Sequence, residues 1–216
     1  DRLYPVESKC PYSFIMTSPL PERRSLDHHD FTEEYPNGIL FGLVSDTHIP
    51  EARFDVFDQA YDAFKEVDFI LHAGDMHDIA VLDYFEERCG KPVLGVCGNG
   101  DDGSSGREVA PDDPRLPYNQ HITVAGKKIG MTHDFPDRPY AHLSSIEERM
   151  DRHFGGPVDI VIAGDTHVPV VVEWDDVLII NSGSPTFPRN LQTQLGTVAF
   201  LDLRDGKLDA WIEQLH

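Results

Sequence analysis

The sequence predicts an α/β protein, a two-sheet β-sandwich flanked by helices. In the first half of the chain, apolar segments of strand length alternate with helical segments, and each apolar segment ends in a polar loop. In the second half, short apolar segments alternate with turns, which is typical of antiparallel sheets. Two sheets packed face to face, with helices outside, would bury both kinds of segment.

The composition is that of a globular protein with a large negative charge. The chain has 216 residues, enough for one domain with a sizeable core, and 40% of them are hydrophobic. The net charge of -20 disfavours non-specific binding to nucleic acid or anionic membrane, and it disfavours a nuclease acting on long DNA or RNA. The same charge would repel a phosphate substrate unless bound divalent cations reversed the sign locally.

The sequence indicates a cytoplasmic protein with no membrane association. No apolar run approaches the roughly 18 residues that a membrane helix needs, and the first residues lack the pattern of a signal peptide. The three cysteines, Cys10, Cys89 and Cys97, form neither a CxxC pair nor a recognisable disulfide framework. A reducing compartment is therefore expected.

Residues 1–37 are expected to form a partly irregular extension, and residues 38–216 the folded domain. The extension has no sustained periodicity and is interrupted by prolines. The adjacent His28 and His29 could bind a metal, but histidines in such a segment are more often solvated, so we assign them no site.

The first half of the domain is expected to contain three buried strands and two helices. Continuous apolar runs are typical of strands covered on both faces. Residues 54–67 carry an apolar stripe at helical spacing, and Gly90 closes a second helical segment. The strands are expected at residues 39–44, 69–71 and 92–96, and the helices at residues 54–67 and 79–89.

The second half is expected to begin with a long loop and a hairpin. Residues 101–119 are polar and rich in proline and glycine, and loops of this length are often functional or mobile. Ala125-Gly126-Lys127 separates two strand-like segments and predicts a hairpin turn. The elements, expected to pair as antiparallel sheet around one helix, are strands at 120–124 and 128–132, a helix at 143–154, and strands at 158–163, 168–174, 177–180, 197–203 and 208–214.

Side chains that can bind metal follow five of these strands. The carboxyl ends of the strands carry the site in an open α/β sheet, so these side chains are expected to lie together. Imidazole nitrogen with carboxylate and amide oxygen suits manganese, iron, zinc or a similar ion, and Asp75 on a central strand is the expected bridge between two ions. His72, within the strand before Asp75, is expected to be structural. The candidate ligands are Asp46, His48, Asp75, Asn99, His133, Asp165 and His167.

Five ordered motifs resemble the signature of the calcineurin-like metallophosphoesterases, in particular the small bacterial and archaeal phosphodiesterases without a cap domain. The resemblance runs from about Gly38 to the C-terminus and does not cover the extension. Asn181-Ser182-Gly183-Ser184 also resembles the Asn-Pro-Gly-Ser turn of that family. The five motifs are Asp46-x-His48, Gly74-Asp75-x-x-Asp78, Gly98-Asn99-x-Asp101, His133 and Gly164-x-Thr166-His167.

The resemblance implies a four-layer architecture and a centre of two divalent metal ions that hydrolyses a small phosphate ester, most plausibly a phosphodiester. Two ions about 3.5–4 Å apart would clamp the phosphate and acidify a bridging water, and the resulting hydroxide would attack phosphorus in line. Asp46, Asp75 and Asn99 would act in catalysis through this hydroxide. Manganese is the expected metal, with magnesium, iron, nickel and zinc as alternatives. By carry-over, one ion would be held by Asp46, His48, Asp75 and His167, and the other by Asp75, Asn99, His133 and Asp165.

The chain departs from the family pattern at two positions. Asp165 stands where the family usually has histidine, and a carboxylate there would shift the second ion towards manganese or magnesium. Gly100 stands where relatives have histidine or cysteine, so the general acid is left unidentified. His142, Tyr140 and Arg107 lie in loops that could supply it, and the sequence does not choose among them.

A non-catalytic function is the alternative. The retromer complex contains a subunit of this fold that has lost metal ligands and works by binding protein partners, and Asp165 and Gly100 could mark similar drift. The intact Asp75 and Asn99 favour an enzyme.

Overall fold

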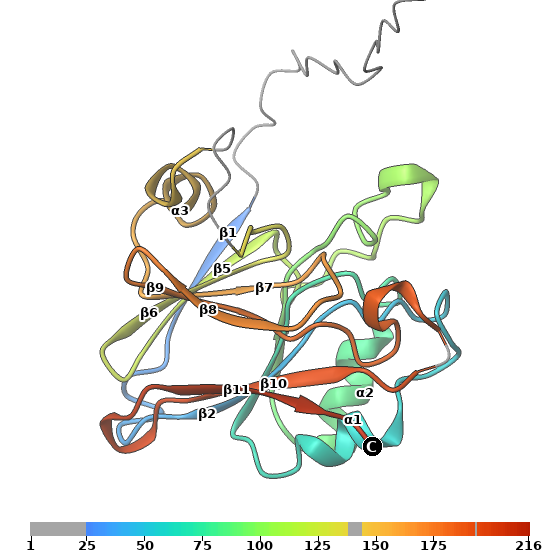
Figure 1. The fold of residues 1–216 in the computed structure, drawn as a ribbon, viewed down its shortest axis with the longest axis horizontal. Coiled ribbons are helices and arrows are strands. Elements are labelled where there is room, and N and C mark those ends of the chain that lie inside the picture. Colours follow the sequence, from blue (N-terminus) through green and yellow to red (C-terminus); the bar gives the residue numbers. More distant parts are fainter. Residues whose placement is uncertain (1–24, 138–143, 193) are drawn as a thin grey trace, which may run out of the picture.

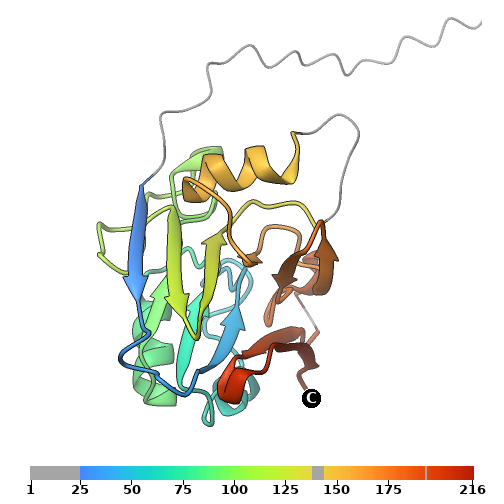
Figure 2. The ribbon, with the colours of Figure 1, turned by 90° about the vertical axis from the view of Figure 1, so that its left-hand side faces the viewer.

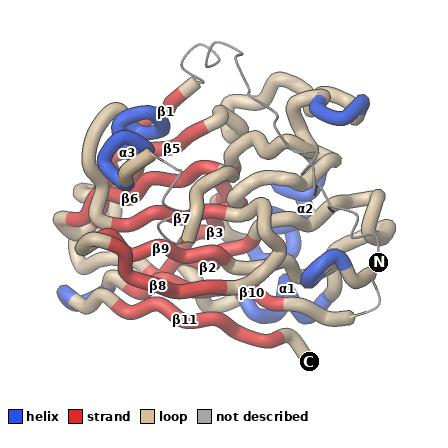
Figure 3. Tube along the Cα trace, turned by 45° about the horizontal axis from the view of Figure 1, so that its top comes forward, coloured by secondary structure: helices blue, strands red, loops and turns tan. Residues whose placement is uncertain are grey.

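Two mixed β-sheets packed face to face form the centre of the molecule (Figure 1). The computed structural model describes residues 25–137, 144–192 and 194–216. Helices α1 and α2 lie on one side of the sheets and α3 lies on the other, which gives four layers (Figure 3). The predicted fold class is therefore confirmed. None of the helices in the described part of the chain has the length and apolarity that a membrane span requires.

The five-stranded sheet has the order β11-β10-β2-β3-β4. Strands β2, β3 and β4 pair in parallel, with β4 at one edge of the sheet. On the other side, β10 pairs antiparallel with β2, and β11 pairs antiparallel with β10. The bounds are β2 (Leu40–Val44), β3 (Phe69–His72), β4 (Val93–Gly95), β10 (Thr197–Asp202), β11 (Asp209–Gln214), α1 (Asp58–Ala63) and α2 (Ala80–Cys89).

The six-stranded sheet has the order β1-β5-β6-β7-β9-β8. Its outer face is covered by α3, whose Ile146, Met150 and Phe154 pack on Val161 and Ile179. The bounds are β1 (Leu26–Asp30), β5 (Asn119–Val124), β6 (Lys127–Thr132), β7 (Ile160–Ala163), β8 (Val170–Trp174), β9 (Val177–Asn181) and α3 (Ile146–Phe154).

The core between the sheets explains the continuous apolar runs of the sequence. Phe41 and Leu43 of β2 face the other sheet, where Ile129 and Ile162 meet them in one cluster. The alternate residue Leu40 packs under the helices instead. Strands β2, β3 and β7 are covered on both faces, so every residue in them is buried. Their sequences therefore show no alternation of apolar and polar residues.

Two predicted helices are confirmed, and the ends of both have local causes. Helix α2 ends at Gly90, which has a left-handed φ of 67°. Helix α3 begins later than expected, at a capping box in which Ser145 and Glu148 exchange side-chain and backbone hydrogen bonds.

The first predicted helix is shorter than expected, because α1 covers only part of residues 54–67. The preceding segment bends at Phe54 and Asp55 instead of continuing the helix, and Asp55 is held there by tertiary contacts. Its carboxylate accepts hydrogen bonds from the Tyr61 hydroxyl at 3.0 Å and from the Arg88 guanidinium at 3.2 Å. The apolar stripe in residues 54–67 therefore included residues of the loop before α1 as well as the helix itself. Val56, for example, is buried but not helical.

The prediction of an antiparallel second half is wrong in part. Strand β7 pairs in parallel with both β6 and β9. Parallel pairing needs a long crossover, and α3 supplies it between β6 and β7. The hairpins β5–β6 and β8–β9 are antiparallel as expected.

Residues 26–30, assigned to the extension, form a strand rather than irregular chain. Strand β1 pairs in parallel with β5 at the edge of the six-stranded sheet (Figure 2). Its sequence Leu-Asp-His-His-Asp has no apolar alternation, and backbone hydrogen bonding to β5 decides its conformation. Residues 1–24 of the predicted extension lie outside the described residues.

Candidate metal centre

The site is built from loops that follow β2, β3, β6 and β7. Their first residues are tied together through the backbone: Asp46 donates its N–H to the Gly74 carbonyl at 2.9 Å, and Gly164 donates to the His133 carbonyl at 3.0 Å. Gly74 is required here, because a Cβ at this position would lie 2.7 Å from Nδ1 of His133. The predicted convergence of the strand ends is therefore present in the structure.

Five of the predicted ligands have a left-handed backbone. A positive φ is strained for residues with a side chain, and such residues cluster at functional sites. The strain aims the side chains of these loops back towards one another. The residues and φ values are Asp46 (55°), His48 (48°), Asp75 (56°), Asp165 (70°) and His167 (55°).

The first group of ligand atoms comes from Asp46, His48 and His167, whose ligand atoms all lie within 4.8 Å of one another. The Nε2 atoms of the two histidines are 3.0 Å apart, and Nε2 of His167 lies 3.3 Å from Oδ1 of Asp46. His167 donates its Nδ1 proton to the Phe187 carbonyl at 3.0 Å, which leaves Nε2 with its lone pair directed into the group.

The second group comes from Asp46, Asp75 and His133. Nε2 of His133 lies 3.3 Å from Oδ1 of Asp75 and 3.9 Å from Oδ1 of Asp46. Nδ1 of His133 donates to the Ala73 carbonyl at 2.7 Å, so this histidine has the same tautomer as His167. The other oxygen of Asp75, Oδ2, lies 3.5 Å from Nε2 of His48. Asp75 therefore stands between the two groups with one oxygen towards each.

Asp165 and Asn99 lie at the rim of the site. Oδ1 of Asp165 is 3.8 Å from Nε2 of His133, and the Asp165 side chain is 47% exposed. Asn99 is exposed and lies between two glycines that contact Asp75. Gly100 donates its N–H to Oδ1 of Asp75 at 2.6 Å, so the loop after β4 wraps around this carboxylate.

The electrostatics of the cluster are those of buried carboxylates balanced by imidazoles. Burial opposes ionisation of Asp46, but hydrogen bonds from His167 and His48 outweigh it and hold the pKa of Asp46 below its ordinary value. Burial would likewise lower the pKa of His133, but the carboxylates of Asp75 and Asp46 raise it to about 10. At neutral pH the second proton of His133 therefore lies on Nε2, at the position that a divalent cation would take.

The residues fit a bound cation. Oδ2 of Asp46, Nε2 of His133 and Nε2 of His77 are buried side-chain atoms with no hydrogen-bond partner among the described residues. A buried polar atom without a partner costs free energy, and a metal ion would satisfy such atoms with the carboxylate and imidazole donors it prefers.

Two residues of the site were not given a role by the sequence. Asp101 accepts backbone hydrogen bonds from Asp75 at 2.8 Å, His77 at 2.7 Å and Gly98 at 2.9 Å, so it fixes the loop that carries Asp75. Its place in Gly98-Asn99-x-Asp101 was the available signal. His77 lies two residues after Asp75, and its spacing repeats that of Asp46-x-His48.

The turn after β9 buttresses the metal-binding loops. Ser184 donates its hydroxyl to the Asp46 carbonyl at 2.7 Å, and Asn181 donates its amide to the Gly164 carbonyl at 2.6 Å. Thr186 donates to the Thr47 carbonyl at 2.6 Å. The turn therefore ties the loop after β2 to the loop after β7.

His72 makes the contacts of a structural residue. Its Nε2 lies 3.1 Å from the Thr47 hydroxyl, and its Nδ1 accepts the Gly74 N–H at 3.2 Å. Burial lowers the pKa of His72 to about 4. Of the three residues considered for a general acid, Arg107 lies 3.5 Å from Oε2 of Glu51. Tyr140 and His142 lie outside the described residues.

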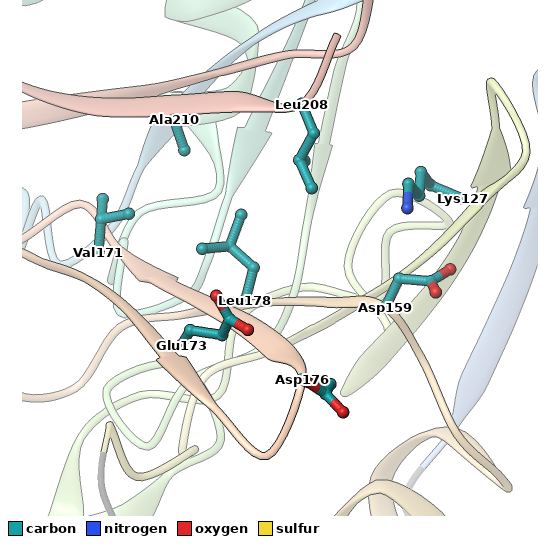
Figure 4. A pocket seen from close by; sticks show the side chains of 8 residues that line it. All are labelled: Lys127, Asp159, Val171, Glu173, Asp176, Leu178, Leu208 and Ala210. Carbon is teal, nitrogen blue, oxygen red and sulfur yellow. The ribbon is translucent and has the colours of Figure 1, made fainter. Parts of the chain in front are cut away.

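A cavity of about 380 Å³ is lined by residues that include Lys127, Asp159 and Leu208 (Figure 4). Lys127 opens β6 and Asp159 precedes β7, whereas His133 and Asp165 follow the other ends of these strands. The cavity is therefore separate from the metal centre.

Comparison with known proteins agrees with this geometry. A probable metallophosphoesterase of Methanocaldococcus jannaschii is 32% identical over 152 residues, which are 70% of each chain. A phosphodiesterase of the same organism is 27% identical over 157 residues, 67% of this chain and 83% of the relative.

Solved structures of other proteins share this fold. A Thermotoga maritima protein is 25% identical with a TM-score of 0.58, covering 82% of this chain and 99% of that one. Vacuolar protein sorting 29 of Cryptosporidium parvum is 22% identical with a TM-score of 0.54, covering 82% and 98%, a similarity that shows the fold alone. The family model of the calcineurin-like phosphoesterase superfamily domain matches residues 39–206. With its carboxylate and histidine ligand groups at the strand ends, the chain belongs to the calcineurin-like phosphoesterase superfamily.

Proposed function

We propose that this protein is a phosphodiesterase of small substrates that works with two divalent metal ions. The observation that carries the proposal is the position of Asp75, whose two oxygens face His133 on one side and His48 on the other, at 3.3 and 3.5 Å. A single carboxylate shared between two ligand groups is what a two-metal centre requires.

Each ion would have its own ligand set. The first ion would be held by Asp46, His48, Asp75 and His167, and the second by Asp75, Asn99, His133 and Asp165. Two bound divalent ions would acidify a water and offset the charge of the phosphate. We propose manganese, because the second set has oxygen donors from three residues and nitrogen from one.

Neighbouring residues of the chain orient several of these ligands. Asp101 fixes the backbone of Asp75, and the carbonyls of Ala73 and Phe187 set the tautomers of His133 and His167. Asp46 is fully buried, so its charge is screened little by solvent. Local positive charge from bound ions is also what would allow an anionic ester to approach a chain of net charge -20.

The scaffold alternative is disfavoured by the same geometry. A centre kept only for its shape gains nothing from buried polar atoms without partners, yet Oδ2 of Asp46 and Nε2 of His133 are such atoms. Retaining them is consistent with a site that binds cations.

The test is turnover of an activated diester, such as bis(p-nitrophenyl) phosphate, with manganese and with chelator. We expect turnover only with metal, and Asp75→Asn should reduce it by more than the roughly 10–100-fold that loss of an outer-shell partner costs. Asp78→Asn is the matched control, since Asp78 is exposed and its carboxylate accepts only the Ala80 N–H, at 3.0 Å, among the hydrogen bonds of the described residues. If the metal-loaded protein shows no turnover above Asp75→Asn, the enzyme proposal is wrong and the scaffold alternative gains.

The diester preference has a separate readout. We expect the activated diester to be hydrolysed faster than p-nitrophenyl phosphate at equal concentration under the same metal. A clear preference for the monoester would support a metal-dependent phosphoesterase and contradict the proposal that it is a phosphodiesterase.

A further inference from the structure

The loop after β3 repeats the local geometry of two metal-binding loops. Three Asp-x-His segments follow β2, β3 and β7, and in each both the aspartate and the histidine have a left-handed φ. In the middle segment Asp75 has φ 56° and His77 has φ 67°. His48 and His167, which end the other two segments, are assigned to the first ion, so His77 occupies the equivalent local position without an assigned role.

His77 also has the orientation of a ligand. Its Nδ1 lies 3.2 Å from Oε2 of Glu51, a contact that favours the proton on Nδ1 and leaves the lone pair on Nε2. This is the arrangement of His133 and His167, whose Nδ1 atoms are held by carbonyl oxygens. An oxygen acceptor behind the ring is the usual partner of a metal-binding histidine.

The Nε2 atom of His77 faces the cluster. It is buried and has no hydrogen-bond partner among the described residues, and the His77 side chain is only 10% exposed. Its ligand atom lies within 4.8 Å of those of His48 and Asp75, and the His77 and His48 rings are 4.3 Å apart. Nε2 is thus a nitrogen donor placed beside two residues of the first ion.

Gly100 makes room for this ring. A Cβ at position 100 would collide with Nε2 of His77 and would lie 2.5 Å from its Cδ2 atom. A side chain at position 100 and the observed position of His77 therefore exclude each other. Because Gly100 has no side chain, the imidazole of His77 can enter the site from a different loop.

We propose that Nε2 of His77 is an additional ligand of the first metal ion and that Glu51 holds it in the ligating tautomer. The inference rests on the proposed two-metal centre. The ion is the first rather than a third, because His77 reaches it through His48 and Asp75, which already belong to it. The first ion then has three imidazoles, from His48, His77 and His167, and the second has one. The first site should favour zinc, cobalt or nickel more strongly than the second.

The test is proton NMR of the cobalt(II)-loaded protein together with calorimetric titration of cobalt. An imidazole bound through Nε2 gives a strongly shifted, exchangeable Nδ1–H signal. We expect such signals from His48, His77, His133 and His167 in the wild type, and loss of one of them in His77→Phe. Phenylalanine keeps a ring against His48 but has no ligand atom. The affinity for the first ion should fall by more than the roughly 10–100-fold that loss of an outer-shell partner costs.

Two further variants and one control separate binding from damage to the fold. Glu51→Ala should weaken the same signal and the same affinity by a smaller factor, because the ring keeps its nitrogen but loses its fixed tautomer. Gly100→Ala should do so by displacing the ring. The control is His28→Phe, which makes the same replacement at an exposed histidine of β1 and should change neither signal nor affinity.

The outcomes distinguish this inference from the proposed function. If His133 and His167 give shifted signals and His77→Phe changes neither their number nor the affinity, His77 is not a ligand and the two-metal centre remains. If the wild type gives no shifted imidazole signal with cobalt, the metal centre itself is absent and both proposals fall.

Discussion

Asp165 is a predicted ligand that lies exposed at the rim of the site. Its backbone N–H donates to Oδ1 of Asp46 at 3.1 Å, while its own carboxylate lies 3.8 Å from Nε2 of His133. Burial, together with the neighbouring carboxylates of Asp134, Asp46 and Asp75, raises the pKa of Asp165 despite the opposing charge of His133. A bound cation would reverse that effect, so the residue is suited to a site where a second ion completes the charge balance.

Substitution of Asp165 tests its role as a ligand. Asp165→Ala should weaken the second ion by roughly 10–100-fold and leave the first in place. Asp165→His should keep two ions bound and shift the preference of the second from manganese towards zinc or nickel, since imidazole replaces carboxylate. Calorimetric metal titration of the wild type and both variants measures this. Identical second-site affinity in all three proteins would remove Asp165 from the ligand set.

At the same scale, Gly100 and His77 show how one absent side chain changes a site. From the sequence, Gly100 indicates only that the general acid of the family is missing at that position. The structure shows that the space is filled by the ring of His77, which comes from the loop after β3. The sequence gives no sign that Gly100 and His77 are in contact, because α2 and β4 lie between them in the chain.

Among the elements, β1 matters most for where the domain begins. Its five residues pair with β5 from Leu26 to Asp30, and the following Phe31 packs against Phe69 with ring centroids 5.1 Å apart. Ser25, just before β1, also belongs to the folded domain, because its carbonyl accepts the Asn119 N–H at 3.0 Å. The boundary expected after residue 37 would cut this strand off.

Truncation measures the contribution of β1. A chain beginning at Ser25 should melt like the full chain and bind the same metal stoichiometry. A chain beginning at Asn37 should keep the stoichiometry, because no candidate ligand precedes it, but lose about 2 kcal/mol from the packing of Phe31, or roughly 4–8 °C in Tm. Thermal unfolding by circular dichroism and metal analysis check this. Equal Tm values would mean that β1 adds nothing, and loss of an ion would implicate His28 or His29.

The whole molecule carries a net charge of -20, which has consequences for its stability. Carboxylates spread over a compact surface repel one another more than in the unfolded chain, and salt screens this repulsion within a Debye length of about 10 Å at 0.1 M. An effect of salt on stability is therefore expected to arise at the surface rather than at the metal centre.

We expect Tm to rise by about 5 °C between roughly 0.05 M and 1 M sodium chloride, which corresponds to about 1–2 kcal/mol. The measurement is thermal unfolding with chelator present throughout, so that divalent ions do not contribute. Potassium chloride should give the same curve, because screening depends on ionic strength and not on the cation. A Tm that stays flat or falls would show that charge repulsion does not limit stability.

The sequence by itself predicted every described strand except β1, the end of α2 at Gly90, and the candidate ligands Asp46, His48, Asp75, His133 and His167 that the structure brings together. These follow from local physics: apolar runs, a left-handed glycine that stops a helix, and polar residues where buried strands end. The tertiary structure decided the parallel place of β7, the pairing of β1 and the contact of His77 with Gly100. Each of these joins segments far apart in the chain, and no local pattern encodes such a contact, because its free energy arises only when the two segments meet.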